Sequence, residues 1–94
     1  MIIVAGAIYV RPKSRDAFVA ESLETMSKAR QAPGCLDFVV AADPIDNDRV
    51  NVFERWDSEV ALETFRGDGP GSTLVSKIVR ASVARYTVSR SGPA

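Results

Sequence analysis

Residues 2–10 limit the possible folds more than any other stretch, because they are apolar on both sides of an extended chain. They read IIVAGAIYV and contain no charged residue. Successive side chains of a strand point to opposite faces of the sheet, so both faces of this strand need cover. Residues 35–42, CLDFVVAA, repeat the pattern with a single acidic residue. The sequence therefore predicts a sheet that is covered on both faces.

The segment after the first strand is typical of a long helix. No Gly or Pro interrupts residues 14–32, Ser14 is a suitable N-cap, and Pro33 and Gly34 end the segment. Its apolar positions at helical spacing predict that Phe18, Val19, Leu23, Met26 and Ala29 face the core or flank that face.

The second half of the chain supplies two more strands and a helical region. Alternating apolar residues predict a third strand within 48–58, paired with residues 35–42 in a hairpin through the turn 43–48. Ser58 caps a short helix over 58–66, Ser72 caps a further helical segment over 72–79, and the last strand spans 81–89.

This order of elements predicts an α+β fold of the ferredoxin-like βαββαβ type. Short connections and right-handed crossovers place the first and third strands in the centre of a four-stranded antiparallel sheet. Both helical regions then cover the same face. We expect one domain over residues 1–90 and a flexible tail over residues 91–94.

The second face of that sheet is too apolar to stay in water. A bare apolar patch of several hundred Å² is unusual on a monomer, and a second copy is the simplest cover. We therefore expect a homodimer through the sheet face that lies away from the helices, with Phe53 packing across it. The alternative is a monomer with an unusually apolar exposed sheet.

Composition excludes several classes of function. The chain has 12 basic and 12 acidic residues, so it lacks the net positive charge typical of nucleic-acid-binding or membrane-binding proteins. A single cysteine, Cys35, gives no internal disulfide and favours a structural role in a cytoplasmic protein. The absence of histidine removes the commonest general base and metal ligand, and no set of residues has metal-ligand spacing.

Four short motifs, in this order, resemble the antibiotic biosynthesis monooxygenase family over residues 2–88: APGCL at 32–36, DP at 43–44, FERW at 53–56 and ALE at 61–63. The resemblance implies a dimeric α/β barrel and an oxygenase that oxidises phenols, hydroquinones or polyketides with O₂ and needs neither flavin nor metal. In this chain Phe65 stands where many relatives have histidine, Val52 stands where some have asparagine, and residues 67–71 replace a Ser-Pro-His segment.

Glu54 and Trp56 are the candidate catalytic residues, because they share one face of the third strand. Glu54 is the first choice as general base, and the alternative is an ion pair with Arg85. Trp56 is either the aromatic wall of a pocket between sheet and helices or a core residue with a satisfied N–H.

The candidate substrate-binding residues are Arg85, Tyr86, Phe65, Val52 and Tyr9. Arg85 and Tyr86 alternate along the last strand, so one of them faces the pocket; Arg85 could hold a phenolate, or could be an ordinary edge-strand charge. For Tyr9 and Phe65 the alternative to a place in the pocket is packing in the core. The loop 67–71 is either a lid or a plain loop.

Three functions remain open after these observations. The first is a dimeric, cofactor-free monooxygenase acting on an aromatic, quinol or polyketide-type small molecule. The second is a non-catalytic protein of the same fold that binds a small apolar ligand, which the missing histidines favour. The third is a structural dimer with a filled core.

Overall fold

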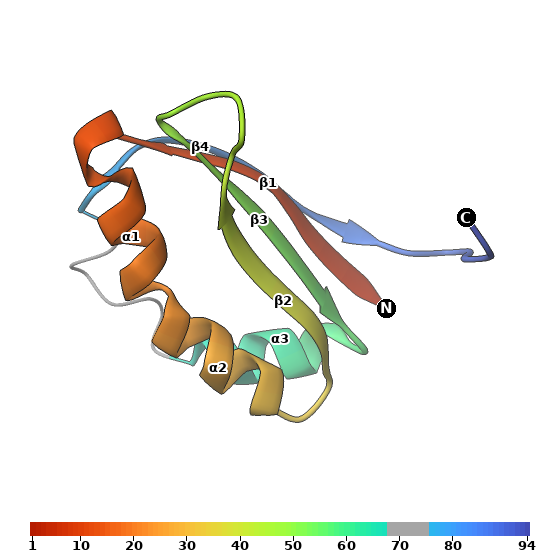
Figure 1. The fold of residues 1–94 in the computed structure, drawn as a ribbon. Helices are drawn as coiled ribbons and strands as arrows, with labels where there is room; N and C mark the ends of the chain where they lie inside the picture. The colour runs from red at the N-terminus through yellow and green to blue at the C-terminus, as the bar shows by residue number, and fades with distance from the viewer. Residues whose placement is uncertain (68–75) are drawn as a thin grey trace.

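In residues 1–67 and 76–94, which the computed structural model describes, four antiparallel strands form one sheet with helices on a single face (Figure 1). The strands are β1 (Ile2–Val10), β2 (Cys35–Ala42), β3 (Arg49–Trp56) and β4 (Ile78–Thr87). The helices are η1 (Pro12–Ser14), α1 (Arg15–Glu21), α2 (Leu23–Gln31) and α3 (Glu59–Arg66). No described helix has the length and hydropathy that crossing a bilayer requires.

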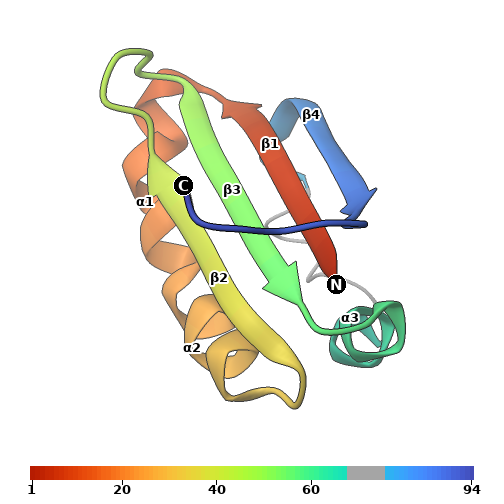
Figure 2. The same ribbon diagram turned by 90° about the vertical axis from the view of Figure 1, so that its right-hand side faces the viewer.

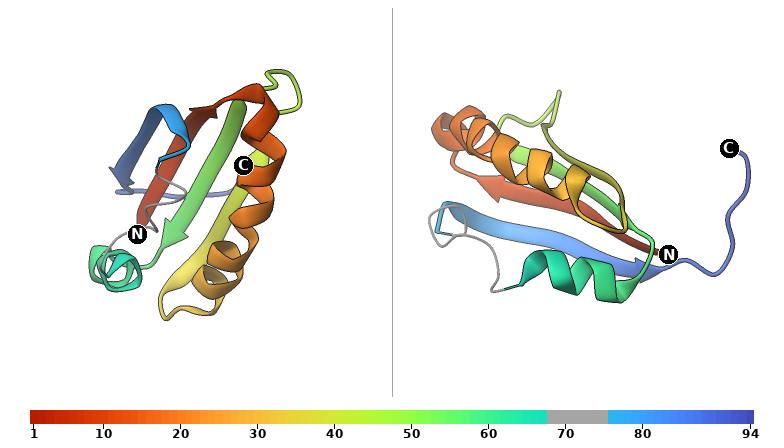
Figure 3. Two further views of the ribbon diagram at one scale, coloured as in Figure 1. Left: turned by 90° about the vertical axis from the view of Figure 1, so that its left-hand side faces the viewer. Right: turned by 90° about the horizontal axis from the view of Figure 1, so that it is seen from below.

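The strand order is β2-β3-β1-β4, which confirms the predicted ferredoxin-like sheet with the first and third strands in the centre. The predicted hairpin between β2 and β3 is also confirmed. Seen from the open side, the sheet lies in front of α1 and α2, and α3 lies near the end of β3 (Figure 2). From the opposite side, α1 and α2 run along the β2 half of the sheet, whereas β4 carries no such cover (Figure 3).

The strand registers place residues in rows across the sheet. Val4 of β1 pairs with Glu54 of β3 on one side and with Arg85 of β4 on the other, and Phe38 of β2 completes this row. The row faces the helices, because Val4, Phe38 and Glu54 are buried. The neighbouring row, which contains Phe53, faces the open side.

Most of the core lies between the sheet and the helices. Trp56, Leu62 and Val50 are fully buried, and a cluster around Trp56 joins β1, β2 and β3 to α2 and α3. The short helix α3 begins as predicted, with the Ser58 hydroxyl accepting a hydrogen bond of 3.1 Å from the Ala61 N–H. Its inward residues Leu62 and Phe65 join the core.

The predicted helix over 14–32 is divided at Ser22. The Ser22 hydroxyl donates to the Phe18 carbonyl oxygen at 2.8 Å, and the Ser22 N–H reaches the carbonyls of both Phe18 and Val19 at 3.1 Å. A serine that bonds back to the preceding turn bends a helix. Ser14 precedes α1, but its side chain does not make the predicted cap hydrogen bond. Ser14 is instead the last residue of the 3₁₀ helix η1.

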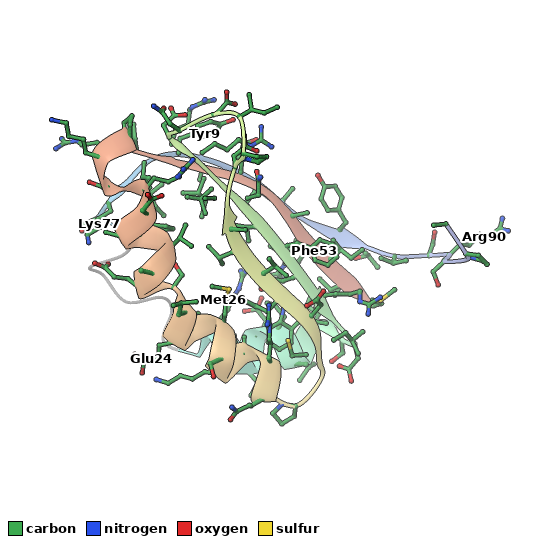
Figure 4. The ribbon with its side chains drawn as sticks, in the orientation of Figure 1. Tyr9, Glu24, Met26, Phe53, Lys77 and Arg90 are labelled. Carbon is green, nitrogen blue, oxygen red and sulfur yellow. The ribbon has the colours of Figure 1, made fainter. Side chains whose placement is uncertain are left out.

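The buried face of the helical region differs from the prediction at one position. Phe18, Ser22, Met26 and Ala29 are buried, whereas Leu23 is 61% exposed. The bend at Ser22 ends α1 and begins α2, and the stripe that packs on the sheet passes through Ser22 and Met26. Met26 projects from α2 toward the sheet and Glu24 lies on the outer side (Figure 4).

The last strand begins earlier than predicted. Ile78 and Val79, which were assigned to a helical segment after Ser72, belong to β4. Ile78 pairs with Val10 of β1, and this pairing extends the sheet at that end. Residues 72–75 of the predicted helical segment, and residues 68–71 of the loop 67–71, lie outside the described residues.

Gly6 allows β1 and β4 to approach closely. Its φ is +152°, and a Cβ atom at this position would lie 2.0 Å from the carbonyl oxygen of Ser82 in β4. Any larger residue would therefore force the two strands apart. Gly6 pairs with both Val52 and Val83, and these two valines line the pocket described below. The close approach at Gly6 therefore sets the spacing of the strands that form the pocket floor.

The turn between β2 and β3 is held by Asp43. One of its carboxylate oxygens accepts from the N–H groups of Ile45 and Asp46 at 3.0 and 2.8 Å, and the other accepts from the Asn51 amide at 2.8 Å. Led by the Asp46 N–H, these bonds favour the charged carboxylate and lower the pKa of Asp43 from 3.8 to about 2.

Asp43→Asn is expected to lower the free energy of unfolding at neutral pH. The stabilisation depends on the charged form in the folded state, so it is present above pH 3.8 and is lost as pH falls toward about 2. Denaturant unfolding over a pH series measures the difference between variant and wild type, which should shrink over that interval. Asp48→Asn, in the same turn, is the control; an equal loss in both variants would contradict this role.

Candidate functional site

A pocket of about 530 Å³ lies between the helix-facing side of the sheet and helices α2 and α3. This volume is in the range of small-ligand sites. Most of its wall is apolar, and a few polar groups converge on it. The lining residues are Val4, Ile8, Thr25, Lys28, Phe38, Val52, Glu54, Phe65, Arg66, Ala81 and Val83.

Glu54 is the buried ionisable group in this lining. It is 7% exposed, and one carboxylate oxygen accepts a hydrogen bond of 3.0 Å from the Trp56 indole N–H. Burial raises the pKa of Glu54, while the indole N–H and the charges of Arg66 and Arg85 act in the opposite direction. A buried carboxyl group with a raised pKa in an apolar pocket is a candidate for proton transfer.

Trp56 lies behind the pocket and outside its lining. It is fully buried in the core, and its ring centroid lies 5.3 Å from that of Phe65, which does line the pocket. Phe65 also contacts Phe38 edge-on at 5.9 Å. The aromatic wall is therefore made by Phe38 and Phe65, and Trp56 supports both the Phe65 ring and the Glu54 carboxylate.

Arg85 faces the helices, as one of the two alternatives predicted, but it does not pair with Glu54. Its guanidinium contacts Glu59 at 2.7 Å and Glu63 at 2.6 Å, both on α3. These hydrogen bonds raise the pKa of Arg85. The predicted Glu54–Arg85 ion pair is wrong, because two acidic residues one turn apart on α3 hold the guanidinium instead.

Tyr86 and Tyr9 lie on the other face of the sheet. Tyr86 pairs with Ile3 in β1 and is 55% exposed. The Tyr9 ring packs under the Arg80 guanidinium at 4.0 Å, a cation–π contact. Alternation along β1 and β4 puts both tyrosines opposite the row that contains Glu54. The structure therefore does not bring them together with Glu54, Phe65 and Val52.

Sequence reasoning missed the polar residues on the helix side of the pocket. Thr25 and Lys28 lie one turn apart on α2, and Arg66 ends α3. Each is next to a buried or half-buried position, so the signal was a polar residue at the border of an apolar stripe. Ala81 and Val83 of β4 were also missed as lining residues.

A second hollow and the single cysteine do not form a candidate site. A second hollow of about 540 Å³ borders the 32–34 turn and α3, and its lining contains no buried ionisable group. Cys35 packs against the core with its pKa raised by burial, which suits the predicted structural role. The part of the chain that the structure describes contains no group of side chains arranged to hold a metal ion.

Residues 1–69 match the family model of the antibiotic biosynthesis monooxygenases. The chain belongs to this family. This agrees with the resemblance seen in the sequence motifs, and the matched region contains every element from β1 to α3, including Glu54 and Phe65.

Solved structures have the same fold. A candidate antibiotic biosynthesis monooxygenase of Deinococcus radiodurans superposes with a TM-score of 0.84 and 19% identity over 100% of this chain and 98% of that chain. One from Caulobacter crescentus gives 0.82 and 19% identity, over 95% and 90% of the two chains. One from Chloroflexus aurantiacus gives 0.78 and 28% identity, over 99% and 96%.

A curated relative from Synechocystis sp., an uncharacterized protein, is 32% identical over 62 residues. The match covers 66% of this chain and 42% of the relative, so this chain spans about two fifths of that relative's length. The relative carries no stated activity.

Proposed function

We propose that this protein is a cofactor-independent monooxygenase that oxidises a phenolic, quinol-type or polyketide-type aromatic molecule with O₂ in the pocket above Glu54. The observation that carries the proposal is a carboxyl group of raised pKa buried in an otherwise apolar and aromatic pocket. Membership of the monooxygenase family supports it.

In the first step Glu54 removes the proton of the substrate hydroxyl. Glu54 must be ionised to do so, and the indole N–H of Trp56 holds its carboxylate in place at 3.0 Å. The resulting phenolate is electron-rich and passes one electron to O₂. The superoxide and substrate radical then combine, and a C–O bond forms at the ring carbon para to the oxygen.

The second half of the reaction removes water. The para carbon now carries a hydrogen and a hydroperoxy group; loss of that hydrogen as a proton and cleavage of the O–O bond give a second carbonyl. The phenol and O₂ are thereby converted into a quinone and one molecule of water. Glu54, protonated in the first step, gives that proton to the peroxide and so forms the hydroperoxy group. It then takes up the proton of the para carbon and passes it to the leaving hydroxide, which leaves as water.

The remaining lining residues bind and enclose the substrate. Phe38 and Phe65 present ring surfaces to an aromatic substrate, and Val52 and Val83 form an apolar floor. Such walls keep water away from the radical pair, which would otherwise separate. Val52, at the place of the relatives' asparagine, contributes shape and no hydrogen bond.

Oxygen uptake with a panel of substituted phenols and hydroquinones, measured on metal-stripped protein, tests this function. We expect uptake above the buffer rate, with a quinone of matching mass as product. Trp56 is the only tryptophan, so its fluorescence reports ligand binding in parallel. Quenching without oxygen uptake would instead support the second candidate, a binding protein, which the absence of histidine favours.

We further propose that two copies associate through the sheet face that lies away from the helices. This face carries Phe53, 37% exposed, and Tyr86, 55% exposed, beside half-buried Ile3, Ala5 and Val39. The helices contact the opposite face, so a second copy covers the apolar side without closing the pocket. The structure supports this proposal by its exposed apolar surface.

Phe53→Asp is expected to convert the dimer into a monomer at micromolar concentration. A carboxylate at the centre of an apolar interface loses its hydration without gaining a partner. Multi-angle light scattering measures the mass of each variant. Ile45→Asp is the control, since Ile45 is apolar and 88% exposed but lies in the β2–β3 turn. A wild-type mass of one chain would contradict the proposed dimer.

A further inference from the structure

The lining of the pocket is divided into an apolar floor and a basic helix side. The floor consists of sheet residues, and Phe38 and Phe65 add aromatic surface to it. Opposite the sheet, α2 contributes Lys28 and α3 contributes Arg66. With Glu54 as the acidic residue of the lining, the pocket has one positive charge more than it has negative charges, although the whole chain is neutral.

The cations belong to different helices and are placed to act together. Thr25 lies one helical turn before Lys28, so α2 presents a hydroxyl and an ammonium along the same side. Arg66 comes from the last turn of α3, and its charge is close enough to act on Glu54. An anionic group between the two helices would therefore meet donors from both.

The ion pair that competes for Lys28 is weak. Lys28 contacts Glu24 at 2.9 Å, but both side chains are mostly in water, at 70% and 77% exposure. Ion pairs of this kind contribute little and are readily exchanged. Arg85, in contrast, is held by Glu59 and Glu63 at 2.7 and 2.6 Å, so it is already neutralised.

We propose that the natural ligand of the pocket is an aromatic molecule with an anionic substituent, whose rings lie on the sheet floor and whose anion is bound by Arg66 and Lys28. The proposal rests on the proposed function, because it assumes that the same pocket holds the substrate. It transfers to Arg66 and Lys28 the anion-binding role first expected of Arg85. A carboxylate fits the planar fork of the Arg66 guanidinium.

The geometry also orients the substrate. An anion held between α2 and α3 places the opposite end of the ring system toward β3, where Glu54 lies in the lining. The anionic group and the oxidised hydroxyl are therefore expected at different ends of the molecule. A ligand without the anion could enter in either direction, and part of its binding would be unproductive.

Two matched probes test this inference: naphthoate, and its neutral amide naphthamide. Calorimetry and Trp56 fluorescence measure binding of each to the full chain. Wild type is expected to bind naphthoate about tenfold more tightly than naphthamide. Arg66→Gln and Lys28→Gln are each expected to weaken naphthoate binding about fivefold and to leave naphthamide unchanged. The advantage should shrink as salt is added.

Lys13→Gln is the control, because it removes an exposed positive charge outside the pocket lining. Equal affinity of wild type for the two probes would overturn the anion proposal and leave the pocket as a ligand site. Equal weakening of both probes in Arg66→Gln would also overturn it, since that result points to damage of the pocket. Failure of wild type to bind either probe would overturn the anion proposal too, whereas the proposed function fails only if phenols and hydroquinones give no oxygen uptake.

Discussion

Replacing Glu54 with glutamine is expected to lower the turnover of a phenolic substrate by about 10²- to 10⁴-fold. The amide cannot take up the substrate proton. It still offers a carbonyl oxygen to the Trp56 indole N–H, which donates to Glu54 at 3.0 Å, so the fold should be kept. Initial rates of oxygen uptake measure the loss, and circular dichroism checks the fold.

The pH profile of the same reaction gives an independent reading. Burial raises the pKa of Glu54 above 4.5, so the carboxylate forms at a higher pH than for an exposed glutamate. Activity should rise as pH increases through that pKa, and glutamine should abolish this rise. Glu21→Gln, which removes an exposed carboxylate bound to Lys77, should leave both rate and profile unchanged. Full activity of Glu54→Gln would end the general-base assignment.

Trp56→Ala is expected to lower the free energy of unfolding by about 3–5 kcal/mol. The side chain is fully buried, so alanine leaves a cavity beside Phe65 and an unsatisfied carboxyl at Glu54. A small domain has about 5–15 kcal/mol of total stability, so this loss is a large fraction of it. Denaturant unfolding followed by circular dichroism measures the change.

Trp56→Phe separates packing from hydrogen bonding. Phenylalanine fills most of the space but has no N–H, so the loss of stability should be smaller. The indole hydrogen bond lowers the pKa of Glu54, and its removal should raise that pKa further. The rise of activity should then move to higher pH. An unmoved profile in a folded Trp56→Phe would show that Trp56 serves only the core.

The strands could be predicted from the sequence because their signal is local. Successive side chains of a strand point to opposite faces, so the sequence determines which residues share a face. The order of elements then gives the strand order β2-β3-β1-β4. Helix ends were harder to predict. The hydroxyl of Ser22 bonds to the Phe18 carbonyl and bends the helix, and this leaves Leu23 exposed.

The site was predicted only in part. Glu54, Phe65 and Val52 line the same pocket, since a strand face and a helix face decide their direction. The partner of Arg85 depends on how α3 lies across the sheet, which the sequence does not state. The basic residues Lys28 and Arg66 have the same appearance in the sequence as any solvated helix residue, and only the packing of α2 and α3 brings them to one pocket.

If the substrate is oxidised in the pocket above Glu54, a side chain that fills this pocket must stop the reaction. Ala81 lines the pocket from the edge strand β4, where a larger side chain enters the cavity without displacing the core. Oxygen uptake should be compared between Ala81→Phe and the control Ala81→Ser, in which the new side chain is close in size to the native alanine. Both variants are first confirmed as folded. We expect Ala81→Phe to lose oxygen uptake and Ala81→Ser to keep it. Unchanged uptake in Ala81→Phe would show that the reaction does not take place in this pocket.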